Sequence, residues 1–190
     1  MPGAGPLRVI ATEGGHTGFA PSNPREVLLL QFLQSKFGHV SWERVLSGPG
    51  IKNIYDFLVA SGEPELPSTR ARMESEDPGA VVGELGLAGR DPTCVATLEM
   101  FAHMYGSEAG NLALKSLATG GVYVAGGIAP RLLSVLRQGG FVEAFNDKGR
   151  MSRLTASFRI AVVLQSEVGL LGACRAGLGE HGTSKIFLHA

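Results

Sequence analysis

Apolar residues recur along most of this chain at the three- and four-residue spacing of helices that bury one face. The clearest helix start follows Asn23, because Pro24 suits the first helical position and Glu26 can reach back to the helix end. This helix is expected to end at Gly38. Further helices are predicted over residues 41–44, 51–62, 91–105, 109–118, 129–136 and 169–177.

Three short apolar runs, at residues 7–11, 122–125 and about 159–164, are predicted to be strands. The first leads into a glycine-rich loop, and the second ends at Gly126 and Gly127 just before a helix. A strand, paired glycines and a helix in that order make a turn that a phosphate or nucleotide can approach. The stretch between residues 63 and 89 is more polar and is predicted to be a loop followed by a weak helix.

The composition is that of a globular protein. The 190 residues fit one ordinary domain, and 44% of them are hydrophobic while 18% are charged. The 17 basic and 17 acidic side chains cancel, and no block of Lys and Arg is present. We therefore expect no basic surface patch that would bind nucleic acid or an acidic membrane surface.

The sequence contains neither a basic and apolar leader at Met1 nor a long uncharged apolar run, so we expect a soluble protein in the cytoplasm. Cys94 and Cys174 lie in segments predicted to be buried helix, as suits free thiols in a reducing compartment. The sequence leaves a disulfide between them open.

The loop at residues 12–21 places a carboxylate, Glu13, three residues before an imidazole, His16, among three glycines. Glycine lets the backbone turn sharply, and the two side chains can accept and donate hydrogen bonds. This combination suits the vicinal hydroxyls of a sugar. Two other interpretations are open: a surface loop whose side chains cap backbone groups, and a metal site, although a third ligand is not apparent.

Other candidates are weaker on their own. Glu43 follows Trp42 in a short predicted helix and would usually be a solvated residue. Gly126 and Gly127 could serve packing alone. The remaining histidines have no visible partner, and the usual nucleophile, Walker-type and paired-cysteine motifs are absent.

Several blocks of sequence, taken together and in order, resemble bacterial glucokinase. They include Ile-Ala-Thr-Glu-Gly-Gly-His-Thr-Gly-Phe-Ala-Pro at residues 10–21 and Gly-Gly-Val-Tyr-Val-Ala-Gly-Gly-Ile-Ala-Pro-Arg at residues 120–131. The other blocks are residues 37–50, 110–114, 141–150 and 169–172. The resemblance covers nearly all of the chain. The cysteine-rich zinc motif of the related repressor and kinase family is absent, which favours the non-zinc branch.

The resemblance implies an α/β fold, namely the helix-rich C-terminal large lobe of the ribonuclease H-like, actin-like ATPase sugar kinases. Its mixed sheet would lack the N-terminal strands. Glu13, His16 and Glu43 match positions that hold glucose hydroxyls, and Gly126 and Gly127 match the adenosine-side motif. The implied activity is ATP-dependent phosphorylation of glucose to glucose 6-phosphate, with Mg²⁺ as cofactor, in a family whose members are often homodimers.

The chain departs from the family pattern at its beginning. The family's Asp-x-Gly-Gly-Thr phosphate loop, its second phosphate loop and its general-base aspartate have no counterpart here. We therefore expect residues 1–190 to be an N-terminally truncated glucokinase large domain, inactive alone, with the catalytic aspartate upstream. The alternative hypothesis is a non-catalytic sugar-binding or interaction module.

Overall fold

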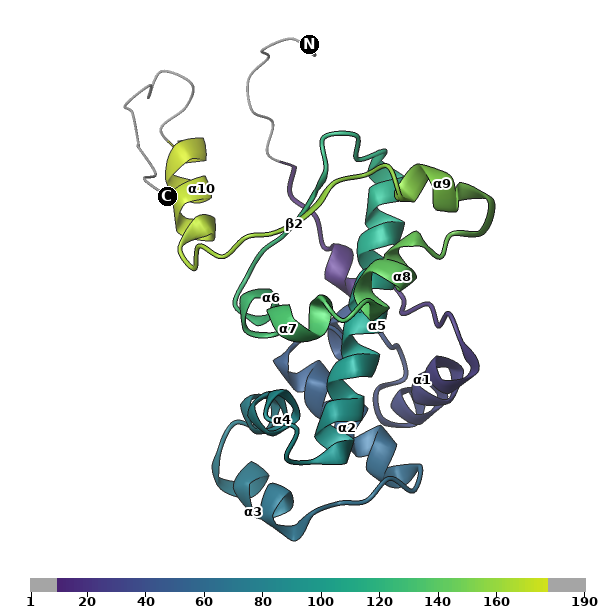
Figure 1. Cartoon of the computed structure of the whole chain (residues 1–190), viewed down its shortest axis with the longest axis vertical. Helices are drawn as coiled ribbons and strands as arrows, with labels where there is room; N and C mark the ends of the chain where they lie inside the picture. The colour runs from purple at the N-terminus through teal and green to yellow at the C-terminus, as the bar shows by residue number, and fades with distance from the viewer. Residues whose placement is uncertain (1–9, 178–190) are drawn as a thin grey trace.

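The computed structural model describes residues 10–177, and these residues form a helix-rich α/β fold with a small parallel sheet (Figure 1). The helices are α1 (Pro24–Phe37), α2 (Gly48–Ala60), α3 (Pro67–Ser75), α4 (Pro78–Leu87), α5 (Pro92–Ser116), α6 (Ile128–Arg131), α7 (Leu133–Leu136), α8 (Gly140–Asn146), α9 (Ser152–Thr155) and α10 (Val168–Gly177). Three single 3-10 turns are η1 (Gly14–His16), η2 (Trp42–Arg44) and η3 (Gly149–Met151).

Helix α5 runs through the middle of the molecule, and most other helices pack on it (Figure 1). The first half of α5 contacts α2 and α4, and its second half contacts α8. The helix begins at Asp91, whose buried carboxylate accepts the backbone N–H groups of Thr93 and Cys94. This is the N-cap interaction that satisfies otherwise unpaired donors at a helix start.

The prediction of two helices between residues 91 and 118 is wrong, because α5 is continuous. Gly106 and Gly110 lie inside it and do not end it. A Cβ at Gly106 would run into the backbone oxygen of Phe141, and one at Gly110 into that of Phe145. Glycine stands here because α8 packs against the bare backbone of α5.

Helix α1 begins and ends where the sequence predicts. Asn23 caps this helix by accepting the N–H of Glu26 at 3.0 Å, and Gly38, at φ +68°, ends it as predicted. Helix α2 begins earlier than the predicted residue 51, because the glycine-rich stretch after Ser47 forms its first turn. Ser47 caps that turn through a 3.0 Å bond from the N–H of Gly50.

The segment between residues 63 and 89 holds two helices, α3 and α4, so the prediction of a loop before a weak helix missed α3. Helix α3 has almost no apolar residues from which a helical spacing could be detected. Polar contacts hold it instead: the buried Thr69 donates a hydrogen bond to the Asp91 carboxylate. On the surface, Arg72 bonds Glu76, directly after the helix, and Glu84 on α4, with N···O distances between 2.7 and 3.0 Å.

Strands β1 (Val122–Val124) and β2 (Ile160–Val162) were both predicted, and they pair in parallel with Val122 opposite Ile160. The third predicted strand is different. Residues 7–9 lie outside the described part of the chain, and residues 10–13 have no regular secondary structure.

Candidate functional site

Two 3-10 turns, η1 and η2, face each other and carry two of the predicted site residues, His16 and Glu43, with Glu13 directly before η1. An antiparallel bridge between Gly18 and Ser41 joins the segments that hold them. Two backbone hydrogen bonds complete this contact: Trp42 N–H donates to the carbonyl of Thr17 at 3.0 Å, and Phe19 N–H donates to that of Val40 at 2.9 Å. Ser41 directly precedes η2, but its backbone serves this bridge and its side chain makes no cap bond.

The bridge brings His16 and Glu43 together. The Nδ1 atom of His16 lies 3.4 Å from Oε2 of Glu43, although both side chains remain more than half exposed. Glu13 directly precedes η1, and its carboxylate makes no cap bond to that turn. The structure therefore gives no support to the interpretation in which the Glu13 carboxylate merely caps its own turn.

A small aromatic core supports the two turns from below. The rings of Phe19 and Trp42 meet edge to face with centroids 5.0 Å apart, and both side chains are buried. Such pairs contribute about 0.5–1.5 kcal/mol beyond the area that they bury. Trp42 is thus a structural neighbour of Glu43, and the segments that carry His16 and Glu43 pack on this buried aromatic pair.

The turn at Gly126 and Gly127 lies on a separate element, between the end of β1 and the start of α6. Gly126 adopts φ +101°, a conformation that favours glycine, so this position is constrained by the backbone. A Cβ placed at either residue would meet no atom within 4 Å. The turn presents bare backbone to open space, an arrangement that a nucleotide could approach.

Two histidines that had no apparent partner in the sequence have one in the structure. His39 Nε2 lies 3.2 Å from the backbone carbonyl oxygen of His16, and His103 Nδ1 lies 2.8 Å from Oε1 of Glu26. Each contact joins residues far apart along the chain, so no spacing rule could have revealed it.

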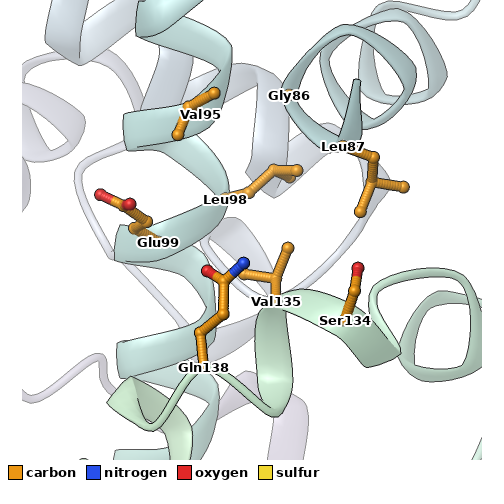
Figure 2. A pocket seen from close by; sticks show the side chains of 8 residues that line it. All are labelled: Gly86, Leu87, Val95, Leu98, Glu99, Ser134, Val135 and Gln138. Atoms are coloured by element: carbon orange, nitrogen blue, oxygen red, sulfur yellow. The ribbon is translucent and has the colours of Figure 1, made fainter. Parts of the chain in front are cut away.

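Two hollows of the described surface lie elsewhere and are not lined by the predicted site residues. In the smaller one, the side chains of Leu87, Leu98 and Val135 point into a gap between α4, α5 and α7 (Figure 2). Its volume is about 60 Å³, well below the roughly 300 Å³ at which ligand pockets begin. A larger groove of about 400 Å³ lies beside β2, α7 and α8 and is mainly apolar. The smaller hollow is too small for a sugar, and the lining of the larger one is mainly apolar.

Residues 10–177 contain no group of three or more His, Cys, Asp and Glu side chains placed to bind a metal ion. Within that same range, no helix is both long and apolar enough to cross a bilayer. Both cysteines are free thiols: Cys94 is buried, whereas Cys174 on α10 is exposed, contrary to the prediction of a buried helix there.

Comparison with known proteins identifies the family. The family model for glucokinase matches residues 1–178. The chain is 43% identical to the glucokinase of Synechocystis sp. over 186 residues, covering 90% of this chain and 52% of that protein. It is 41% identical to the glucokinase of Chromobacterium violaceum over 181 residues, covering 95% and 49% respectively.

A crystal structure of glucokinase from an Antarctic psychrotroph matches the fold with a TM-score of 0.75 at 35% identity, over 88% of this chain and 49% of the other. The described fold is thus shared with a glucokinase structure. The chain belongs to the glucokinase family. It spans about half the length of the curated relatives that it matches.

Proposed function

We propose that this chain supplies the glucose-binding residues and part of the adenosine side of an ATP-dependent glucokinase, which converts glucose to glucose 6-phosphate. The observation that carries the proposal is the approach of His16 to Glu43 across the facing turns, at 3.4 Å. These two residues, together with Glu13, are the positions that the resemblance assigned to the sugar.

The chemistry of the three side chains suits the task. Carboxylates accept hydrogen bonds from sugar hydroxyls in charge-assisted bonds, which are roughly twice as strong as neutral ones. The imidazole of His16 can both donate and accept. With the rigid Phe19 and Trp42 pair beneath them, Glu13, His16 and Glu43 would orient the sugar without rearranging the backbone.

We propose further that residues 1–190 form the C-terminal large domain of this kinase. Two facts support this: the chain matches about half of each relative, and the described sheet has only two strands. We assign no catalytic base within the chain. Asp91 is fully buried and caps α5, so it is unavailable to a sugar hydroxyl.

ATP would meet the chain at Gly126 and Gly127, where the bare backbone leaves room for the adenosine side. The described residues offer no cluster of ligands for Mg²⁺, so we assign no step to the metal in this part of the protein. The free thiols of Cys94 and Cys174 suit a reducing compartment, and we place the activity in the cytoplasm.

Isothermal titration calorimetry with glucose on the 190-residue chain tests the sugar site. The wild type should bind, and Glu13→Ala and Glu43→Gln should each weaken binding by roughly tenfold to hundredfold, because a charged hydrogen bond contributes about 1.5–3 kcal/mol. Glu74→Gln, an exposed carboxylate on α3, is the matched control and should leave the affinity unchanged. Binding that is absent, or equal in all four proteins, would count against the sugar site.

The alternative, a non-catalytic sugar-binding or interaction module, makes a different prediction. It requires glucose binding that is sensitive to Glu13 and Glu43 but no turnover when the missing kinase lobe is supplied. A turnover assay with that lobe present therefore separates a kinase from a non-catalytic module.

A further inference from the structure

His39 lies directly after the end of α1 and reaches the turn that carries the proposed sugar residues. Its Nε2 atom is 3.2 Å from the backbone carbonyl oxygen of His16. The preceding residue, Gly38, has φ +68°, which turns the chain back toward η1 and η2 as α1 ends. His39 is itself exposed, so burial of its ring does not explain its position.

The Gly18–Ser41 bridge and its two backbone hydrogen bonds form a short ladder, and the carbonyl group of His16 lies just beyond it. The ladder bonds use the carbonyls of Thr17 and Val40, and in the described residues the one donor to the His16 carbonyl is the His39 ring. An imidazole can donate from Nε2 in its cationic form and in the neutral form with the proton on that atom. The ring therefore extends the ladder by one bond that the backbone does not supply.

The same segment also contacts the opposite turn. The guanidinium group of Arg44, in η2, lies 4.1 Å from the centroid of the Phe37 ring. Residues 37–39 thus contact η2 through Phe37 and η1 through His39. They link the turn that carries His16 to the turn that carries Glu43.

We propose that His39 is a positioning residue for the sugar site: its hydrogen bond to the His16 carbonyl holds η1 against η2 and sets the spacing of Glu13, His16 and Glu43. This role rests on the proposed function, but its structural half can be tested separately. Without the bond, η1 keeps the ladder and the Phe19–Trp42 ring contact but loses the one link made through the His16 carbonyl, so the spacing of the sugar residues is less tightly set.

Three substitutions separate hydrogen bonding from mere occupancy. In His39→Gln the side-chain amide N–H can reach about as far as Nε2, so the bond should survive. In His39→Asn the amide is too short to reach, and His39→Ala has no donor. Gln31→Ala, at an exposed position on α1, is the control. Because His39 is exposed, all four variants should fold, and circular dichroism checks this.

Trp42 provides a readout that does not depend on glucose, since it is the sole tryptophan and is buried under the ladder. We expect acrylamide quenching of its fluorescence to rise about twofold or more in His39→Asn and His39→Ala, and to stay at the wild-type level in His39→Gln and Gln31→Ala. The glucose dissociation constant should follow the same order, rising about threefold to tenfold in the first pair, as the loss of one hydrogen bond allows.

Unchanged quenching in His39→Ala, or equal effects of Gln, Asn and Ala, would overturn the proposal. A wild-type chain that binds no glucose would contradict the proposed function, while the quenching series would still decide whether His39 holds the turn.

Discussion

Glu26 is a buried carboxylate that ties the start of α1, which lies between η1 and η2 in the sequence, to the central helix α5. Its Oε2 atom accepts the backbone N–H and the hydroxyl of Ser22 at 2.7 and 2.9 Å, and its Oε1 atom contacts Nδ1 of His103 on α5 at 2.8 Å. Burial alone would raise the pKa of Glu26, but the hydrogen bonds from His103 and Ser22 outweigh it and lower the pKa. The bond to Glu26 in turn raises the pKa of His103, against a smaller opposing effect of burial.

These opposite shifts predict a window of pH in which the pair stabilises the fold. The lowered pKa of Glu26 adds stability above its ordinary value of 4.5, and this is lost as the pH falls through the folded pKa. The raised pKa of His103 adds stability below its ordinary value of 6.5, and this is lost as the pH rises through the folded pKa. The full contribution therefore lies between about pH 4.5 and 6.5.

We expect the unfolding free energy of wild type to exceed that of His103→Gln most clearly inside this window, with the difference shrinking toward pH 8 and above. Gln keeps a hydrogen-bond donor but cannot be protonated, so it removes only the titrating charge. Urea denaturation at a series of pH values measures the difference. Curves for the two proteins that run parallel from pH 5 to pH 8 would show that the pair does not carry the effect.

Glu13 and His16 could be proposed from the glycine-rich loop and from the resemblance, whereas Glu43 followed from the resemblance alone. His39 and His103 could not. Their partners, the His16 carbonyl and Glu26, are brought to them by the path of the chain, and no local pattern records that path. Whether the three exposed residues bind glucose is a prediction still to be tested.

Helix boundaries were predictable where local chemistry sets them and not where packing does. The cap at Asn23 and the stop at Gly38 fix α1, and both were visible in the sequence. Helix α3 was missed because polar contacts, the buried bond of Thr69 to Asp91 and the surface ion pairs of Arg72, stand in place of an apolar face. Helix α5 was divided wrongly because Gly106 signals a break to any local rule, whereas it is the contact point for α8.

This explanation of Gly106 predicts opposite effects for two glycine substitutions. Gly106→Ala places a methyl group against the backbone of Phe141 and should destabilise the fold by about 1–3 kcal/mol, as overpacking of a core does. Gly83→Ala is the matched control inside α4, where a Cβ meets nothing within 4 Å. It should stabilise by up to about 1 kcal/mol through helix propensity. Urea unfolding measures both, and a Gly106→Ala protein as stable as wild type would refute the packing argument.

Considered as a whole, residues 10–177 form a helical body built around α5 with a two-stranded sheet (Figure 1). It matches about half of each glucokinase relative. The proposed sugar residues lie on an open surface, where the His16 and Glu43 side chains are 69% and 59% exposed. A kinase must shield its reacting groups from water, so we expect another lobe to cover this surface during turnover. We thus predict that this surface binds the sugar but needs the other lobe for catalysis.

The most direct measurement uses a chimera of this chain and the part of the Synechocystis glucokinase that the chain does not match, and it follows ADP formation in a coupled assay. We predict glucose-dependent turnover by the chimera, and a fall in kcat/KM of roughly tenfold to hundredfold in the Glu43→Gln chimera, with Glu74→Gln as the unaffected control. A folded chimera that binds ATP and glucose but forms no ADP would contradict the kinase account and favour a non-catalytic sugar-binding module.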